Sequence, residues 1–175
     1  MDHADLVALI RDGVVPGRWA DLGSGDGAFT LALADLLGAG ARILSVDRDG
    51  RALSRQRQSM QARFPEAAVK YVKADFTRGL ELPALDGVVM ANSLHFVRRR
   101  EPVLDLVRRA LVPGGRLVVV EYDADRGNLW VPHPFSYATW EGVAAAAGFV
   151  DTSLLARRPS PWLGAMYSAL SFRPA

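Results

Sequence analysis

The sequence predicts one α/β domain, residues 1–175, built around a mostly parallel β-sheet. Short apolar runs alternate with segments of helical periodicity, as in strands joined by crossover helices. The run Leu117–Val120 is continuously apolar, which is typical of a strand covered on both faces. The last two predicted strands have no helix between them, so they must pair antiparallel.

The first half of the chain holds four of these strands. A short helix at about 3–12 precedes the first strand. The segment 28–37 is apolar on most faces, which indicates a helix packed against the sheet, whereas the helix at 50–64 is polar with a thin apolar stripe at Leu53, Met60 and Phe64. The strands predicted between these helices are Arg18–Leu22, Ala41–Asp47, Val69–Ala74 and Leu85–Ala91.

The second half continues the pattern and then departs from it. Val103, Val107, Ala110 and Leu111 recur at helical spacing, and Pro113–Gly115 ends that helix because proline and glycine do not extend it. The remaining expected elements are a strand at Arg116–Glu121, a loop at 123–135, a helix at 136–147 ended by Gly148, and strands at about 149–157 and 165–173 joined by a turn with Pro159, Pro161 and Gly164.

Composition excludes several classes of protein. The chain has no cysteine, so disulfides, thiolate nucleophiles and cysteine-ligated zinc are excluded. Acidic residues near the N-terminus argue against a signal peptide, and no apolar run reaches the ~18 residues of a membrane span. We therefore expect a cytoplasmic enzyme or binding protein. A nucleic-acid partner is not expected: the pI is about 9.3, but the formal charge is only +2, and Arg98–Arg100 is interpreted as a solvated helix start.

The segment Asp21–Gly27, Asp-Leu-Gly-Ser-Gly-Asp-Gly, is the most informative motif. It follows a strand and opens a helix, and glycines there allow a tight turn and close backbone approach to a ligand. The helix N-terminus then offers free N–H groups to an anion. Asp47, at the end of the next strand, stands where a ribose-binding carboxylate belongs. These features fit a nicotinamide dinucleotide as well as other adenosine cofactors, and a purely structural turn is the third alternative.

Further motifs distinguish among these alternatives. Asp21–Gly27 with Val46-Asp47 is followed by Lys73–Phe76, by Asp86–His95 and by Leu111–Leu117. In this order and spacing the sequence resembles the class I S-adenosylmethionine-dependent methyltransferase family along nearly its whole length. The resemblance implies a doubly wound, Rossmann-like seven-stranded sheet, mostly parallel, with a C-terminal antiparallel strand pair. It also implies S-adenosylmethionine as the cofactor.

The resemblance assigns roles to the motif residues. Asp21 and the backbone of Gly23, Ser24, Gly25 and Gly27 would face the methionine part of the cofactor. Asp47 would bind the ribose hydroxyls and Asp75 the adenine amino group. Phe76 would flank the adenine ring, and Asn92 would lie beside the sulfonium. Arg48 departs from the family pattern, which has an apolar residue there; its guanidinium either stacks on the ring or is solvated.

Residues after the fourth and fifth strands are candidates for the acceptor side. His95 suits acid–base chemistry near neutral pH or, alternatively, caps a helix or orients a loop. Glu121 or Asp123 would bind a cationic or hydroxyl acceptor, or else is a solvated strand end. Trp130, His133 and Phe135 would form an aromatic wall over the acceptor, or pack on the core.

We expect a small-molecule methyltransferase. The rival enzyme is an NAD(P)-dependent oxidoreductase, which lacks an evident Tyr-x-x-x-Lys pair because both lysines lie in the third predicted strand. A non-catalytic S-adenosylmethionine-binding or assembly module is the third hypothesis. About 16 residues precede the first strand, so either the acceptor cleft is open or a partner subunit, as in a homo-oligomer, covers it.

Overall fold

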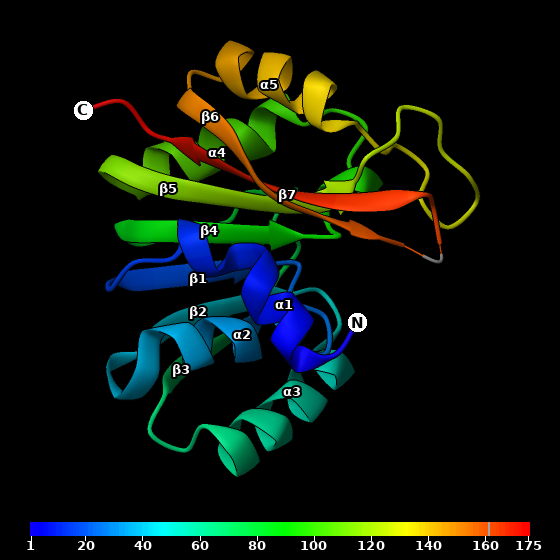
Figure 1. The fold of residues 1–175 in the computed structure, drawn as a ribbon. Helices are drawn as coiled ribbons and strands as arrows, with labels where there is room; N and C mark the ends of the chain where they lie inside the picture. The colour runs from blue at the N-terminus through cyan, green and yellow to red at the C-terminus, as the bar shows by residue number, and fades with distance from the viewer. Residues whose placement is uncertain (161) are drawn as a thin grey trace.

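A computed structural model describes residues 1–160 and 162–175, which form a seven-stranded sheet with helices on both faces (Figure 1). The strands are β1 (Arg18–Leu22), β2 (Arg42–Asp47), β3 (Ala68–Lys73), β4 (Leu85–Ala91), β5 (Leu111–Tyr122), β6 (Val150–Pro159) and β7 (Ala165–Phe172). The helices are α1 (His3–Ile10), α2 (Ala28–Leu37), α3 (Gly50–Arg63), α4 (Glu101–Ala110) and α5 (Tyr137–Ala146).

The strand order is β3-β2-β1-β4-β5-β7-β6, and it confirms the expected sheet. Neighbours from β3 to β5 pair parallel, whereas β7 pairs antiparallel with both β5 and β6. The order reverses at β1, which has β2 on one side and β4 on the other. In open α/β sheets a ligand binds at such a reversal, beyond the carboxyl ends of the strands.

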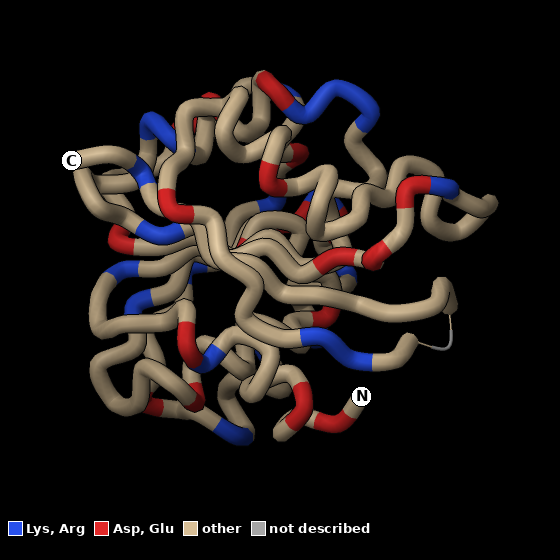
Figure 2. Tube along the Cα trace, turned by 45° about the horizontal axis from the view of Figure 1, so that its top comes forward, with Lys and Arg blue, Asp and Glu red and all other residues tan. Residues whose placement is uncertain are grey.

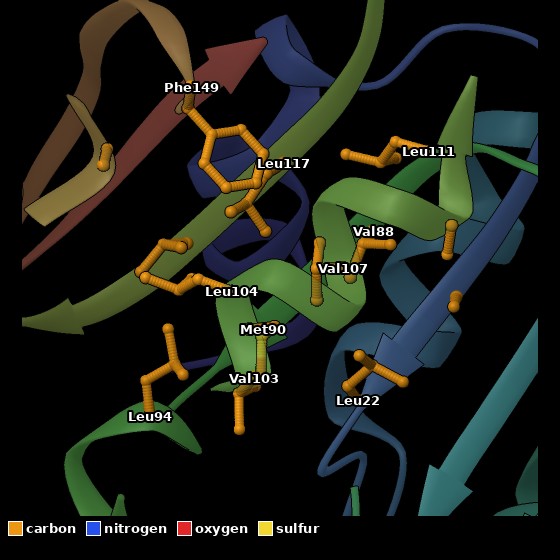
Figure 3. Close-up of a cluster of buried hydrophobic side chains, with 14 of the residues drawn as sticks. Leu22, Val88, Met90, Leu94, Val103, Leu104, Val107, Leu111, Leu117 and Phe149 are labelled. Carbon is orange, nitrogen blue, oxygen red and sulfur yellow. The ribbon is translucent and has the colours of Figure 1, made fainter. Parts of the chain in front are cut away.

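Two apolar clusters hold the helices against the two faces of the sheet. One joins α4 and α5 to the sheet through buried side chains such as Val107, Leu117 and Phe149 (Figure 3). The other joins α1, α2 and α3 to the opposite face and contains Trp19, Phe29 and Met60. Both faces of the central strands are therefore covered, which is why their sequences are continuously apolar.

The largest difference from the sequence expectation concerns the end of α4 and the start of β5. The helix predicted to include Leu111 ends at Ala110, and β5 begins at Leu111 instead of Arg116. Gly114 has a φ of 72°, and the backbone around it is hydrogen-bonded to the C-terminal segment: the N–H of Gly114 donates to the carbonyl of Arg173, and the N–H of Arg173 donates to the carbonyl of Gly115. Pairing with a distant segment thus turns an apparent helix stop into an irregular start of the strand. Pro161, expected in the last turn, lies outside the described residues.

Charged residues of both signs occur along the whole chain. Lys and Arg segments alternate with Asp and Glu segments along the trace (Figure 2). Among the described residues, no helix is long and apolar enough to cross a bilayer.

Candidate functional site

A cavity of about 500 Å³ lies at the carboxyl ends of β1 to β4, where the strand order reverses. It brings together segments that are far apart in the sequence: the glycine loop after β1, the ends of β2 and β3, and the turn after β4. The lining residues are Gly23, Gly25, Asp26, Asp47, Arg48, Asp49, Ala52, Arg55, Ala74, Asp75, Phe76, Thr77, Asn92, Ser93, Phe96 and Val97.

The glycine loop requires glycine at two positions, where an added Cβ would collide with a neighbouring side chain. A Cβ at Gly23, where φ is 80°, would lie 2.6 Å from the Cβ of Ser93. A Cβ at Gly27, where φ is 89°, would lie 2.2 Å from Cγ of Gln56. Gly25 is different, because a Cβ there would meet nothing within 4 Å. The loop is thus packed closely at both ends, while its middle presents bare backbone to the cavity.

Asp47 ties the end of β2 to this loop. Its Oδ2 accepts a hydrogen bond from the backbone N–H of Gly25 (2.7 Å), and its Oδ1 accepts from the N–H of Asp49 (2.8 Å). Each carboxylate oxygen has a second lone pair, so Asp47 can still accept a hydroxyl donor from a ligand. The carboxylate therefore both positions the loop and lines the cavity.

Asp75 and Phe76 line the cavity at the end of β3. Asp75 Oδ1 accepts from the backbone N–H (2.9 Å) and the hydroxyl (2.6 Å) of Thr77, and these hydrogen bonds hold the pKa of Asp75 below its usual value. Arg48 lines the same cavity and has an exposed side chain. The ring of Phe76 lies close to Gly23, since a Cβ on that glycine would be 3.2 Å from Cε1 of Phe76.

Asn92 adds an unpartnered polar atom to the cavity wall. Its φ is 51°, a left-handed conformation that asparagine adopts more readily than most residues. The backbone N–H donates to the carbonyl of Val120 (2.8 Å), but the buried Oδ1 has no hydrogen-bond partner among the described residues. A buried acceptor without a partner is costly, so a hydrogen-bond donor or a positive charge placed beside it would be stabilised.

Asp21 and Ser24 are in the motif but do not line the cavity. Asp21 is buried beneath the loop, where its Oδ2 accepts from the hydroxyl of Thr30 (2.6 Å). Burial raises the pKa of Asp21 to about 7, against the lowering effect of the Thr30 hydrogen bond and with a smaller raising effect from the charge of Asp47. Ser24 Oγ lies 2.8 Å from Ser45 Oγ, also beneath the loop.

Sequence reasoning missed a buried partner of these residues, Gln56 on α3. Its amide contacts Thr30, Ser45 and Ser24. The signal was present in the spacing, because Gln56 follows Leu53 by three residues and precedes Met60 by four, on the buried face of the helix. A helix pattern defined by apolar residues alone does not include Gln56.

His95 and Glu121 contact each other in the interior. His95 Nδ1 lies 2.8 Å from Glu121 Oε2, and Glu121 Oε1 accepts from the backbone N–H groups of Leu94 (2.9 Å) and His95 (3.2 Å). Glu121 is fully buried, and both of its oxygens have partners within the protein. This geometry favours a role in holding the turn after β4 over direct contact between Glu121 and an acceptor.

The loop at 123–135 divides its aromatic residues between core and surface. Phe135 is buried against Trp140, with the guanidinium of Arg100 over its ring, so it packs on the core. Trp130 is 70% exposed. Asp123 is engaged as well, accepting from Tyr137 N (2.9 Å) and Arg157 Nε (2.8 Å).

The cavity fits the cofactor that the sequence resemblance implies. Bare backbone at Gly25, acids at the ends of β2 and β3, an aromatic ring at Phe76 and the orphaned Oδ1 of Asn92 together offer contacts for an adenosine and an amino acid. Among the described residues, no group of three or more His, Cys, Asp or Glu side chains could hold a metal ion. Residues of α1 pack on α2 and do not line the cavity.

Comparison with known proteins agrees with this geometry. The family described as "Methyltransferase domain" matches residues 20–119. The chain is 30% identical over 131 residues to the ubiquinone/menaquinone biosynthesis C-methyltransferase UbiE of Azotobacter vinelandii, covering 71% of this chain and 51% of that protein. It is 33% identical over 141 residues to the carboxy-S-adenosyl-L-methionine synthase of Erwinia tasmaniensis, covering 73% and 56%.

The fold itself has a near match among solved structures. The YcgJ protein of Bacillus subtilis superimposes with a TM-score of 0.81 at 12% identity, covering 99% of this chain and all of that one. The chain spans about half the length of the two relatives above, and their names state different reactions. They therefore leave the acceptor of this chain open.

Proposed function

The chain belongs to the class I S-adenosylmethionine-dependent methyltransferase family, and from this premise we propose that it transfers the methyl group of S-adenosylmethionine to a small-molecule acceptor. One observation carries the proposal: the bare glycine loop, Asp47 and Asp75 line a single cavity at the reversal of the strand order. The family match favours this activity over the oxidoreductase alternative.

The cavity residues have distinct roles in this proposal. Asp47 accepts hydrogen bonds from the ribose hydroxyls with the lone pairs that Gly25 and Asp49 leave free. Asp75 accepts from the adenine amino group, and its low pKa keeps it ionised at neutral pH. Phe76 and the guanidinium of Arg48 flank the ring. Asn92 places its free Oδ1 beside the sulfonium.

When bound, S-adenosylmethionine supplies a methyl group already activated by a positively charged sulfur. The protein therefore contributes chiefly by holding the acceptor in line, which is worth about 7–11 kcal/mol in well-oriented reactions. Where the acceptor must lose a proton, we assign this step to His95. Glu121 engages Nδ1 of that ring, which leaves Nε2 as the nitrogen available to take the proton.

Titration calorimetry with S-adenosylhomocysteine and with NAD tests the cofactor half of the proposal. We expect the wild-type protein to bind S-adenosylhomocysteine with micromolar or tighter affinity and NAD far more weakly. Binding of NAD alone would overturn the assignment. Methyl transfer from radiolabelled S-adenosylmethionine to a panel of phenols, quinols, amines and carboxylic acids then tests the acceptor half; cofactor binding without turnover on any member would favour the non-catalytic module.

A further inference from the structure

Gln56 occupies an unusual place for a residue of a polar helix. Its side chain is fully buried, whereas the other buried residues of α3 are apolar. It does not line the cavity, so it has no direct contact with a ligand there. A buried amide is stable only when its donors and acceptors find partners, and the identity of those partners indicates what the residue does.

The two ends of the amide bond to elements on either side of the glycine loop. Oε1 accepts from Ser45 Oγ (2.9 Å) and more distantly from Ser24 Oγ (3.4 Å), which belongs to the start of the loop. Nε2 donates to the hydroxyl of Thr30, in the first turn of α2, and Thr30 in turn donates to Asp21. Gln56 thus connects the start of the glycine loop to the helix that the loop enters.

The stem of Gln56 also supports the loop sterically. A Cβ added to Gly27 would lie only 2.2 Å from Cγ of Gln56 and within 2.8 Å of its Cδ and Nε2. Gly27 is the last residue before α2 and has a left-handed backbone conformation. The hydrogen bonds join Ser24, at the start of the loop, to Thr30 in α2, and the side-chain stem limits the space into which Gly27 can move.

We propose that Gln56 is a positioning residue for cofactor binding, which holds the Ser24–Gly27 backbone in its binding conformation from beneath. The inference rests on the proposed function, since it requires that the cavity bind S-adenosylmethionine. A loop that samples other conformations binds with an affinity reduced by the fraction of time spent in the competent one. Removing the two-ended connection should therefore weaken binding although no cavity residue changes.

The test compares Gln56→Met with Gln58→Met by titration calorimetry with S-adenosylhomocysteine. Methionine keeps the length and flexibility of the side chain but removes both hydrogen-bonding groups, and Gln58 is an exposed residue of the same helix. We expect the dissociation constant to rise about tenfold in Gln56→Met, as for the loss of one to two hydrogen bonds, and to stay within twofold of wild type in Gln58→Met.

Hydrogen–deuterium exchange without ligand separates positioning from general destabilisation. Exchange of a peptide spanning residues 22–31 should accelerate in Gln56→Met, while that of a peptide spanning 111–122 should not change. If Gln56→Met does not fold, Ser45→Ala removes one arm of the connection with a smaller change, and its dissociation constant should rise about threefold.

An unchanged affinity together with unchanged exchange in the 22–31 peptide would overturn the inference, as would an equal loss in Gln58→Met. Failure of the wild-type protein to bind S-adenosylhomocysteine would instead overturn the proposed function. In that case the exchange measurement, which needs no ligand, would still decide whether Gln56 holds the loop.

Discussion

The two sides of the carboxyl edge of the sheet place their polar groups differently. Beyond β2 and β3, the carboxylates of Asp47 and Asp75 line the cavity. Beyond β4 and β5, the side chains of His95 and Glu121 are buried against each other. Beyond this pair, the loop at 123–135 exposes two large apolar side chains, Leu129 at 88% and Trp130 at 70%.

This difference shows that a carboxylate at a strand end need not face a ligand. Asp47 and Glu121 both lie where a parallel strand ends, and both accept backbone hydrogen bonds. Glu121 also faces a histidine and is enclosed by the loop at 123–135, whose His133 N–H donates to the carbonyl of His95 (3.0 Å). The carboxylate of Asp47 is therefore open to a polar ligand, whereas that of Glu121 is engaged in holding the turn after β4 and the ring of His95.

The largest expected effect is on turnover and comes from the buried His95. We expect His95→Gln to lower turnover by about 10²- to 10⁴-fold, the usual contribution of acid–base catalysis, with an acceptor that needs deprotonation. Affinity for S-adenosylhomocysteine should stay within twofold, because His95 does not line the cavity. His3→Gln, on α1 and outside the cavity, is the control and should keep its turnover. Equal activity of His95→Gln and wild type would make His95 purely structural.

Asp21, buried beneath the glycine loop, should make the free energy of unfolding depend on pH. Its folded-state pKa of about 7 exceeds its ordinary value of 3.8, so the folded state holds this proton more tightly than the unfolded state. The resulting stabilisation is complete below about pH 4 and is lost as pH rises through about 7. Between pH 5 and pH 8, the free energy of unfolding measured with denaturant should fall by about 3 kcal/mol more in wild type than in Asp21→Asn. Parallel pH profiles for the two proteins would contradict this.

Gly27→Ala should damage the glycine loop from beneath. The new Cβ would collide with Gln56 and would force a left-handed backbone on alanine, at a cost of about 2–3 kcal/mol in the free energy of unfolding. S-adenosylhomocysteine binding should also weaken, as calorimetry would show. Gly142→Ala is the control, because Gly142 is exposed in α5 with nothing within 4 Å of the added Cβ. It should be neutral or slightly stabilising.

Asp47→Ala should weaken S-adenosylhomocysteine binding by about 2 kcal/mol, through loss of charge-assisted hydrogen bonds. Asp47→Asn keeps an acceptor for the N–H of Gly25 and should lie between the alanine variant and wild type in calorimetry. An unchanged dissociation constant in Asp47→Ala would show that the ribose does not bind at this carboxylate.

The smallest effect is expected at the exposed apolar surface. Trp130→Ala should change the free energy of unfolding by less than about 0.5 kcal/mol, because the side chain is mostly solvated. If Trp130 contributes to an acceptor wall, the KM for the acceptor should rise while cofactor affinity stays constant. Trp162→Ala, on the turn between β6 and β7, is the control for general loss of surface tryptophan. A KM unchanged in Trp130→Ala would leave the acceptor to the cavity residues alone.

Much of the fold could be predicted because its signals are local. The alternation of apolar runs and helical patterns gave the sheet, and the absence of a helix between the last strands required the antiparallel pair, which β6 and β7 form. The start of β5 could not be predicted, since Leu111 is compatible with a helix until Arg173 pairs with Gly115 across the sheet. Element boundaries of this kind depend on hydrogen bonds between distant residues.

Which backbone segments turn tightly and which strands end in acids can be predicted from neighbouring residues, because glycine content and strand periodicity are local properties. Which of those polar groups face the cavity depends on how distant segments pack. Asp47 and Asp75 line it, while Asp21, Glu121 and His95 are enclosed by side chains and loops that come from elsewhere in the chain. Burial and hydrogen-bond partners are set by packing between segments far apart in sequence, so no local motif encodes them.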